Sequence, residues 1–152
     1  MSAMKRACEI KRVGTWSAAE AIDRVVLDAG DRHRRRVVLT GRAGTRFLLD
    51  LETPAMLKDG DGLVLEDRAI VEVVSQPEPL LELGAATASQ FVCLAWHLGN
   101  RHTDVQIVGE RLRIRHDHVL EEMAAGLGAK VTPVEAPFDP GAGADLKHSH
   151  DG

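Results

Sequence analysis

The side chains of this sequence that are best suited to chemistry are its histidines, and their distribution is uneven. His33 is the one histidine of the first half, and the other six follow residue 95: His97, His102, His116, His118, His148 and His150. Neutral imidazole is a common ligand for nickel, copper and zinc, and these ions do not require a thiolate. The second half of the chain is therefore predicted to bind a transition-metal ion.

His102 is the strongest single candidate ligand because of the turn that precedes it. The stretch Trp96–His102 is predicted to close a long apolar helix, with Gly99-Asn100 as its left-handed stop, so that the ring of His102 faces outward. His97 lies on the last helical turn, where a favourable charge at the helix end or a packing role is the more ordinary interpretation.

The other candidates form two pairs with the same spacing. His116 and His118 flank one residue at a predicted hairpin-to-helix junction, and they point to the same side if that segment is extended. His148 and His150 repeat the spacing in the C-terminal tail. Each also fits an ordinary strand-end, first-turn or solvated-tail position, but their number in one half of the chain favours metal binding.

Motifs for other chemistry are missing from the sequence. It contains no His-Glu-x-x-His, no Gly-x-Ser-x-Gly and no glycine-rich phosphate loop. Cys8 and Cys93 are single and far apart, which excludes a disulfide framework and a Cys-x-x-Cys motif and predicts two free thiols. The sequence thus offers metal ligands without a catalytic signature.

Composition and charge limit the function classes further. The 152 residues are 44% apolar and 28% charged, as expected for a globular protein with one full core or two small ones. There is no apolar run of about 18 residues and no N-terminal signal segment, so we expect a cytoplasmic protein without membrane contact. Residues 1–75 hold 13 Lys and Arg against 12 Asp and Glu, whereas residues 76–152 hold 6 against 11. The acidic second half disfavours nucleic-acid binding and favours cations as ligands.

Residues 1–75 are predicted to form a small all-β domain. Strands separated by turn residues are expected over 8–10, 22–27, 36–40, 46–51, 62–65 and 69–74. Asp59-Gly60-Asp61-Gly62 is similar to the start of a calcium loop, but Ile70 stands where such a loop needs its last glutamate, so calcium is rejected. The run Arg32–Arg36 is interpreted as a charged strand edge that discourages aggregation, with an anion or partner patch as the alternative.

From residue 76 onward the hydrophobic spacing becomes helical. A hinge at 75–79 is followed by predicted helices over about 79–98 and 118–127, a hairpin over 105–108 and 111–115, and a strand over 130–136. Together with a strand at 69–76, these give the ferredoxin-like βαββαβ order. The predicted fold class is α+β: an N-terminal all-β domain (1–75), a ferredoxin-like domain (76–138) and a flexible histidine-containing tail (139–152).

Four motifs follow one another in the second half of the chain. They are Trp96-His97-Leu98-Gly99-Asn100-Arg101-His102, Asp117-His118-Val119-Leu120-Glu121-Glu122-Met123, Leu127-Gly128-Ala129 and Ala136-Pro137-Phe138. In type and order they resemble the UreE family, the urease accessory nickel metallochaperones, and the β-rich first half agrees in length and character. The resemblance implies a peptide-binding-like β domain, and a ferredoxin-like domain that binds metal and forms a homodimer.

The resemblance also implies a function and a role for each candidate histidine. Family members deliver Ni²⁺ to the urease apoprotein together with its accessory proteins, including the GTPase, and they are not enzymes. His102 matches the histidine that closes the family motif at the dimer interface, where two copies share a nickel ion. His116 and His118 match positions that bind additional metal in some members, and His148 and His150 correspond to a C-terminal region that captures metal. The same imidazoles also accept Zn²⁺ or Cu²⁺, and the short tail implies a small storage capacity.

Two other function classes remain open from the residues alone. A metal-dependent hydrolase needs three fixed ligands, an open position and a general base, for which Glu121 and Glu122 are candidates. An RNA- or peptide-binding adaptor with incidental histidines is compatible with a ferredoxin-like fold. Three Phe, two Trp and no Tyr provide few stacking residues for RNA.

Overall fold

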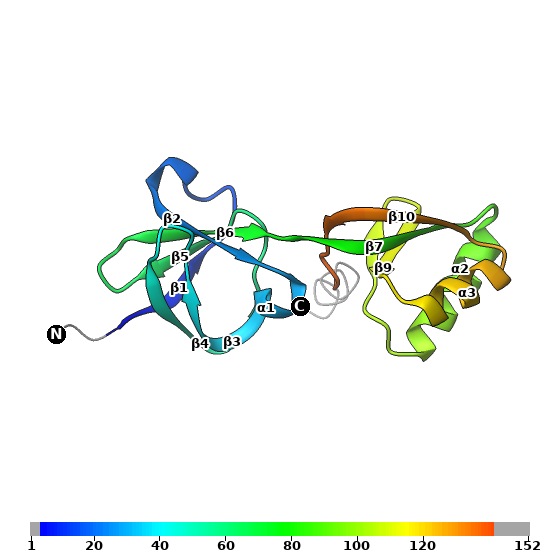
Figure 1. Cartoon of the computed structure of the whole chain (residues 1–152), viewed down its shortest axis with the longest axis horizontal. Coiled ribbons are helices and arrows are strands. Elements are labelled where there is room, and N and C mark those ends of the chain that lie inside the picture. The colour runs from blue at the N-terminus through cyan, green and yellow to red at the C-terminus, as the bar shows by residue number, and fades with distance from the viewer. Residues whose placement is uncertain (1–3, 142–152) are drawn as a thin grey trace. The chain divides into compact units, whose positions relative to one another are not determined.

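The chain divides into two compact units, with the boundary between Gln76 and Pro77. The computed structural model describes residues 4–141 (Figure 1). The first unit is a curved sheet and the second is a sheet with two helices, so the predicted α+β fold class is confirmed.

The first unit is built on a six-stranded sheet. Its strands are β1 (Lys5–Lys11), β2 (Ala21–Leu27), β3 (His33–Thr40), β4 (Arg46–Met56), β5 (Gly62–Leu65) and β6 (Ile70–Ser75). They lie in the order β2-β6-β5-β1-β4-β3; the β1–β4 and β2–β6 pairs are parallel and the other pairs are antiparallel. Two short helices, η1 (Ala18–Glu20) and α1 (Ala29–Arg32), lie in the connections.

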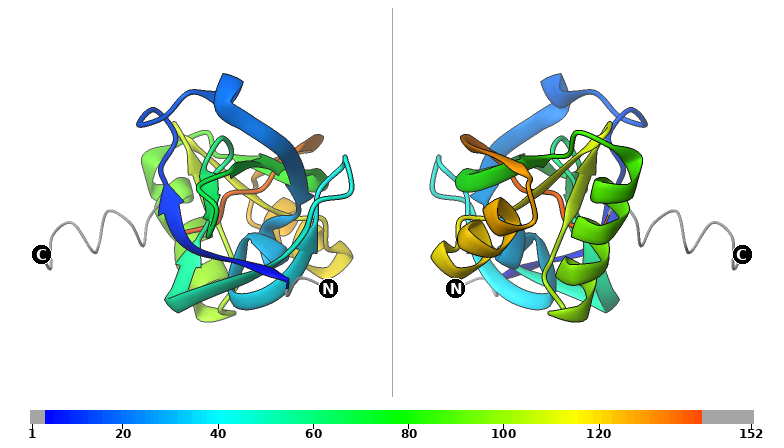
Figure 2. Two further views of the ribbon diagram at one scale, coloured as in Figure 1. Left: turned by 90° about the vertical axis from the view of Figure 1, so that its left-hand side faces the viewer. Right: turned by 90° about the vertical axis from the view of Figure 1, so that its right-hand side faces the viewer.

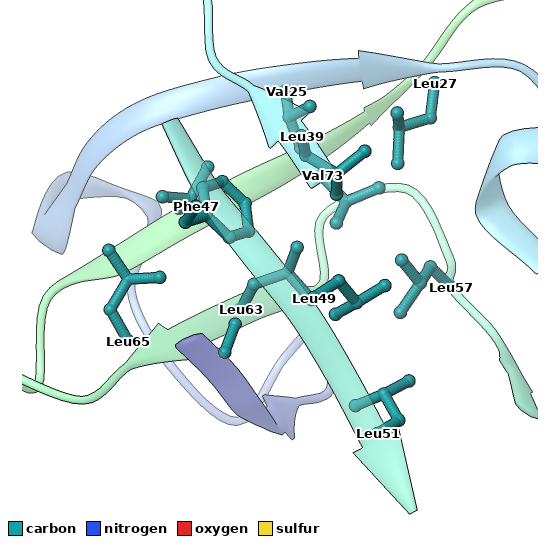
Figure 3. Packing of buried hydrophobic residues seen from close by; sticks show 12 residues of the cluster. Val25, Leu27, Leu39, Phe47, Leu49, Leu51, Leu57, Leu63, Leu65 and Val73 are labelled. Carbon is teal, nitrogen blue, oxygen red and sulfur yellow. The ribbon is translucent and has the colours of Figure 1, made fainter. Parts of the chain in front are cut away.

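Alternating side chains of these strands make the core of the first unit. In β4, Phe47, Leu49 and Leu51 are buried, because every second side chain of a strand points to the same face. Side chains from the other strands converge on them (Figure 3). β3 is an edge strand of the sheet with exposed Arg34, Arg35 and Arg36, whereas Arg32 is buried in α1 and does not belong to that edge.

The buried carboxylate of Asp23 fastens the β3–β4 turn to β2. It is 7% exposed and accepts the backbone N–H groups of Arg24, Ala43 and Thr45 at 2.7, 2.9 and 3.0 Å. A Cβ on Gly41 would collide with this carboxylate, which explains the glycine at that position. Burial by itself would raise the pKa of Asp23, but these backbone donors and the Thr45 hydroxyl together outweigh it and lower the pKa to about 2.

The second unit has the predicted βαββαβ order. Its strands are β7 (Pro77–Gly84), β8 (Gln106–Val108), β9 (Arg111–Arg115) and β10 (Lys130–Pro137), and they form an antiparallel sheet in the order β10-β7-β9-β8. The helices α2 (Ala88–Asn100) and α3 (His118–Gly126) pack on one face of this sheet (Figure 2). The core between them contains Leu81, Leu83, Leu94, Leu98, Leu112, Ile114 and Ala124.

The start of this unit differs from the prediction. Residues 77–84 form strand β7 and not the first turns of a helix from 79, and the strand at 69–76 belongs to the first sheet as β6. Leu81 and Leu83 face the helices, and Leu80 on the opposite face is fully buried as well. A strand buried on both faces loses the alternation of apolar and polar residues, and its leucines can then imitate helical spacing.

No helix in the part of the chain that the structure describes is both long enough and apolar enough to cross a membrane.

Asp23→Asn is expected to lower the free energy of unfolding by about 1–3 kcal/mol at neutral pH, because an amide has one acceptor oxygen and its NH₂ group would face backbone donors. The folded-state pKa of about 2 lies below that of an unfolded aspartate, about 3.9. The stabilisation is therefore complete above about pH 4 and is lost as the pH falls toward about 2. Urea unfolding of both proteins measures the difference, and a difference that stays constant over this pH window would contradict the prediction.

Candidate metal centre

Helix α2 ends in a turn that has His102 at its left-handed position. The His102 N–H donates to the Gly99 carbonyl at 3.0 Å and the Thr103 N–H donates to the Leu98 carbonyl at 3.2 Å, which together form a Schellman motif. The residue in the left-handed conformation is His102, with a φ of 55°. Gly99 and Asn100, predicted to form the stop, lie within the helix, so that part of the prediction is wrong.

A histidine with a left-handed backbone lowers the stability of the fold, and its presence therefore indicates a functional constraint at this position. The left-handed conformation costs a residue with a Cβ roughly 1–2 kcal/mol, and glycine is the usual choice. Such strain is typical of functional positions. The side chain of His102 is exposed, and the turn that holds it is hydrogen-bonded to a helix whose Leu94 and Leu98 are buried. The imidazole is thus presented to solvent from a fixed backbone.

His116 and His118 lie at the junction of β9 and α3. Asp117 between them has an extended backbone (φ −149°, ψ 122°) and caps α3 by accepting the Leu120 N–H at 2.9 Å. Both histidines are exposed, and Nε2 of His118 lies 3.2 Å from Oε1 of Glu122, one helical turn further on. The extended backbone at Asp117 is the conformation that a shared orientation of the two rings requires.

An ion pair joins the His102 segment to the His116 segment. Asp104, two residues after His102, lies 3.0 Å from Arg115, the residue before His116. Because β8 and β9 are antiparallel, both segments lie at the open end of this hairpin, away from its turn at Gly109. Two groups of candidate ligands that are separate in the sequence therefore lie at one end of the sheet.

The last described residues reach the same end. Phe138 is fully buried, and the guanidinium of Arg115 lies 4.9 Å from the centre of its ring. The Asp139 N–H donates to the side-chain oxygen of Gln106 at 3.1 Å, and the Gly141 N–H donates to the Val105 carbonyl at 3.4 Å. His148 and His150 lie outside the described residues, the last of which, Gly141, contacts Val105, three residues after His102.

The described histidines do not form a compact ligand set by themselves. Residues 4–141 contain no group of three or more His, Cys, Asp or Glu side chains placed to hold one metal ion.

The outer face of α2 carries a feature that the sequence did not predict. Val92 and Trp96, one helical turn apart, are 67% and 62% exposed. They line a shallow apolar groove together with Ala88, Ser89, Cys93 and His97. The rings of Trp96 and His97 meet edge to face with centroids 5.0 Å apart. The available signal was that Val92 and Trp96 extend the apolar arc of this helix beyond the side that contains Leu94 and Leu98, so that the arc is wider than one buried face needs.

Comparisons with known proteins cover both units. Residues 8–76 match the model of the UreE urease accessory protein, N-terminal domain, and residues 78–152 match that of its C-terminal domain. A urease accessory protein UreE of Rhodopseudomonas palustris (strain BisB18) is 52% identical over 154 residues, which cover 98% of this chain and 72% of the relative. The namesake of Bradyrhizobium sp. (strain ORS 278) is 53% identical over 147 residues, 97% of this chain and 70% of the relative. The urease accessory protein UreE of Chelativorans sp. (strain BNC1) is 47% identical over 132 residues, which cover 87% of this chain and 84% of the relative. The chain belongs to the UreE family of urease accessory proteins.

Proposed function

We propose that this protein is a nickel metallochaperone that delivers Ni²⁺ to the urease apoprotein during assembly of the urease metallocentre, with no catalytic activity of its own. Family membership supports the role, and the exposed, left-handed His102 is the observation that carries the assignment of the site. The proposed partners are the urease apoprotein and its accessory proteins, including the GTPase. A cytoplasmic location is part of the proposal, and the exposed free thiols of Cys8 and Cys93 suit a reducing compartment.

The proposed nickel site is shared by two copies of the chain. A single imidazole binds a divalent ion weakly, and the described residues provide no compact set of three ligands around His102. Two His102 rings that face each other across a two-fold axis would make binding depend on the dimer. A site that forms between subunits can also open to release its ion, as a carrier must.

The exposed face of α2 is the proposed dimer surface. Val92 and Trp96 are largely exposed, and aromatic side chains of this kind are enriched at the centres of protein interfaces. The helix leads directly into the turn of His102. An isologous contact along α2 would therefore bring two copies of that turn toward the two-fold axis.

His116, His118, His148 and His150 are proposed as additional ligands that capture metal. The first two lie at the same end of the sheet as His102. The seven residue-to-residue steps from Gly141 to His148 span at most about 24 Å when extended, a length that would let the tail histidines approach this end. Zn²⁺ and Cu²⁺ are expected to compete for the same nitrogen ligands.

His102→Ala is expected to abolish tight nickel binding, because it removes the imidazole that each subunit contributes. Isothermal titration with Ni²⁺ measures the loss, and His33→Ala in the first unit is the matched control, with an unchanged isotherm. Nickel binding by His102→Ala that equals that of the unsubstituted protein would refute the site.

His102→Gly is expected to lose nickel binding in the same way but to be about 1 kcal/mol more stable than His102→Ala, because glycine adopts the left-handed conformation without strain. Urea unfolding of the metal-free variants measures this difference. Equal stability of the two variants would show that the backbone at His102 is not strained.

Trp96→Glu is expected to convert the dimer into monomers, because it places a charge at the centre of the proposed apolar interface. Light-scattering mass at micromolar concentration reports the change, and tight nickel binding should be lost with the dimer although His102 is intact. Val119→Glu is the control, since Val119 is a 61% exposed apolar residue on α3. Dissociation by Val119→Glu and not by Trp96→Glu would move the interface to α3.

A further inference from the structure

The groove on the outer face of α2 contains a cysteine and a histidine, two residue types that can bind metal, which the proposed nickel site does not use. Cys93 and His97 both line this groove, and they are four residues apart on the helix. Side chains with this spacing lie above one another, with Cβ atoms about 5–6 Å apart. The same i, i+4 spacing on a helix face lets paired histidines hold zinc in metalloproteases.

Neither side chain is buried within the single chain that the structure describes. Cys93 is an exposed free thiol, and His97 is partly exposed. Among the described residues, neither side chain makes a hydrogen bond or an ion pair, and the edge of the Trp96 ring is the neighbour recorded for the His97 imidazole. A partly exposed imidazole and an exposed thiol, one helical turn apart in the same groove and without competing partners, have the spacing of a two-donor metal site.

The Cys93 thiolate and the His97 imidazole together favour a different ion from the one assigned to His102. A thiolate sulfur is a soft ligand and an imidazole nitrogen a borderline one, and together they suit zinc. The histidines at the sheet end provide nitrogen alone. When the ion binds, the thiol proton passes to solvent and the sulfur coordinates as a thiolate.

We propose that Cys93 and His97 form a separate two-donor site for a thiophilic divalent ion such as Zn²⁺, on the helix that leads to His102. Two donors leave two of the four tetrahedral positions for water or for the same pair on a second copy. The site does not depend on the nickel site at His102. The site lies on the face of α2 that we propose as the dimer surface. An ion bound there would therefore lie where two copies are proposed to meet.

Titration of the fully reduced protein with Co²⁺, a spectroscopic substitute for Zn²⁺, tests this proposal. A cysteine ligand gives a thiolate-to-cobalt charge-transfer absorption that nitrogen and oxygen ligands do not give. We expect this absorption in the unsubstituted protein and in Cys8→Ser, its loss in Cys93→Ser, and an apparent affinity lowered about tenfold or more in His97→Ala. Cys8 is the matched control because it is also an exposed free thiol, on β1 in the other unit.

A second measurement needs no substitution. Zn²⁺ is expected to slow alkylation of Cys93 by iodoacetamide and to leave alkylation of Cys8 unchanged in the same sample, as read by mass spectrometry of the two peptides. His102→Ala separates this site from the nickel site, because it should keep the cobalt absorption while losing tight nickel binding. The proposal is overturned by absence of the cobalt absorption, by its persistence in Cys93→Ser, by an unchanged affinity in His97→Ala, or by its loss in His102→Ala.

Discussion

The structure around the candidate metal centre depends on how helix α2 ends. The last carbonyls of a helix have no partner within it, and here two of them accept the N–H groups of His102 and Thr103. This closure requires His102 to adopt a left-handed backbone, which opposes folding. Burial of Leu94 and Leu98 against the sheet holds the helix in place and offsets that cost. The imidazole of His102 is therefore exposed to solvent, and the end of the helix holds its backbone in the left-handed conformation.

The same end of the second unit is held together by contacts between segments far apart in the chain. Asp104 pairs with Arg115, and Arg115 also lies over the ring of the buried Phe138. The buried ring of Phe138 thus holds the last described residues against the end of the sheet at which His102 and His116 lie.

The sequence predicted most elements correctly where local signals were strong. Asp117 caps α3, Gly128 follows that helix with a φ of 86°, and the hairpin of β8 and β9 lies where alternation placed it. The prediction failed at β7, because burial on both faces of a strand depends on what packs there and not on the strand itself. It failed at Gly99 as well, where the helix continues to Asn100, two residues beyond its predicted end.

The sequence by itself determined the chemistry that this protein has available: imidazoles concentrated in one half, two unpaired thiols and no catalytic motif. It also indicated the family, because the four family motifs can be read directly from the sequence in their order. The tertiary structure decided which of these groups lie together and which face solvent. The left-handed backbone of His102 comes from local hydrogen bonds at the end of α2, but the burial of Leu94 and Leu98 that fixes this helix, and the contact of Arg115 with Phe138, join residues far apart in the chain. Periodicity and spacing describe a segment's own preferences, whereas exposure is set by what the rest of the fold covers.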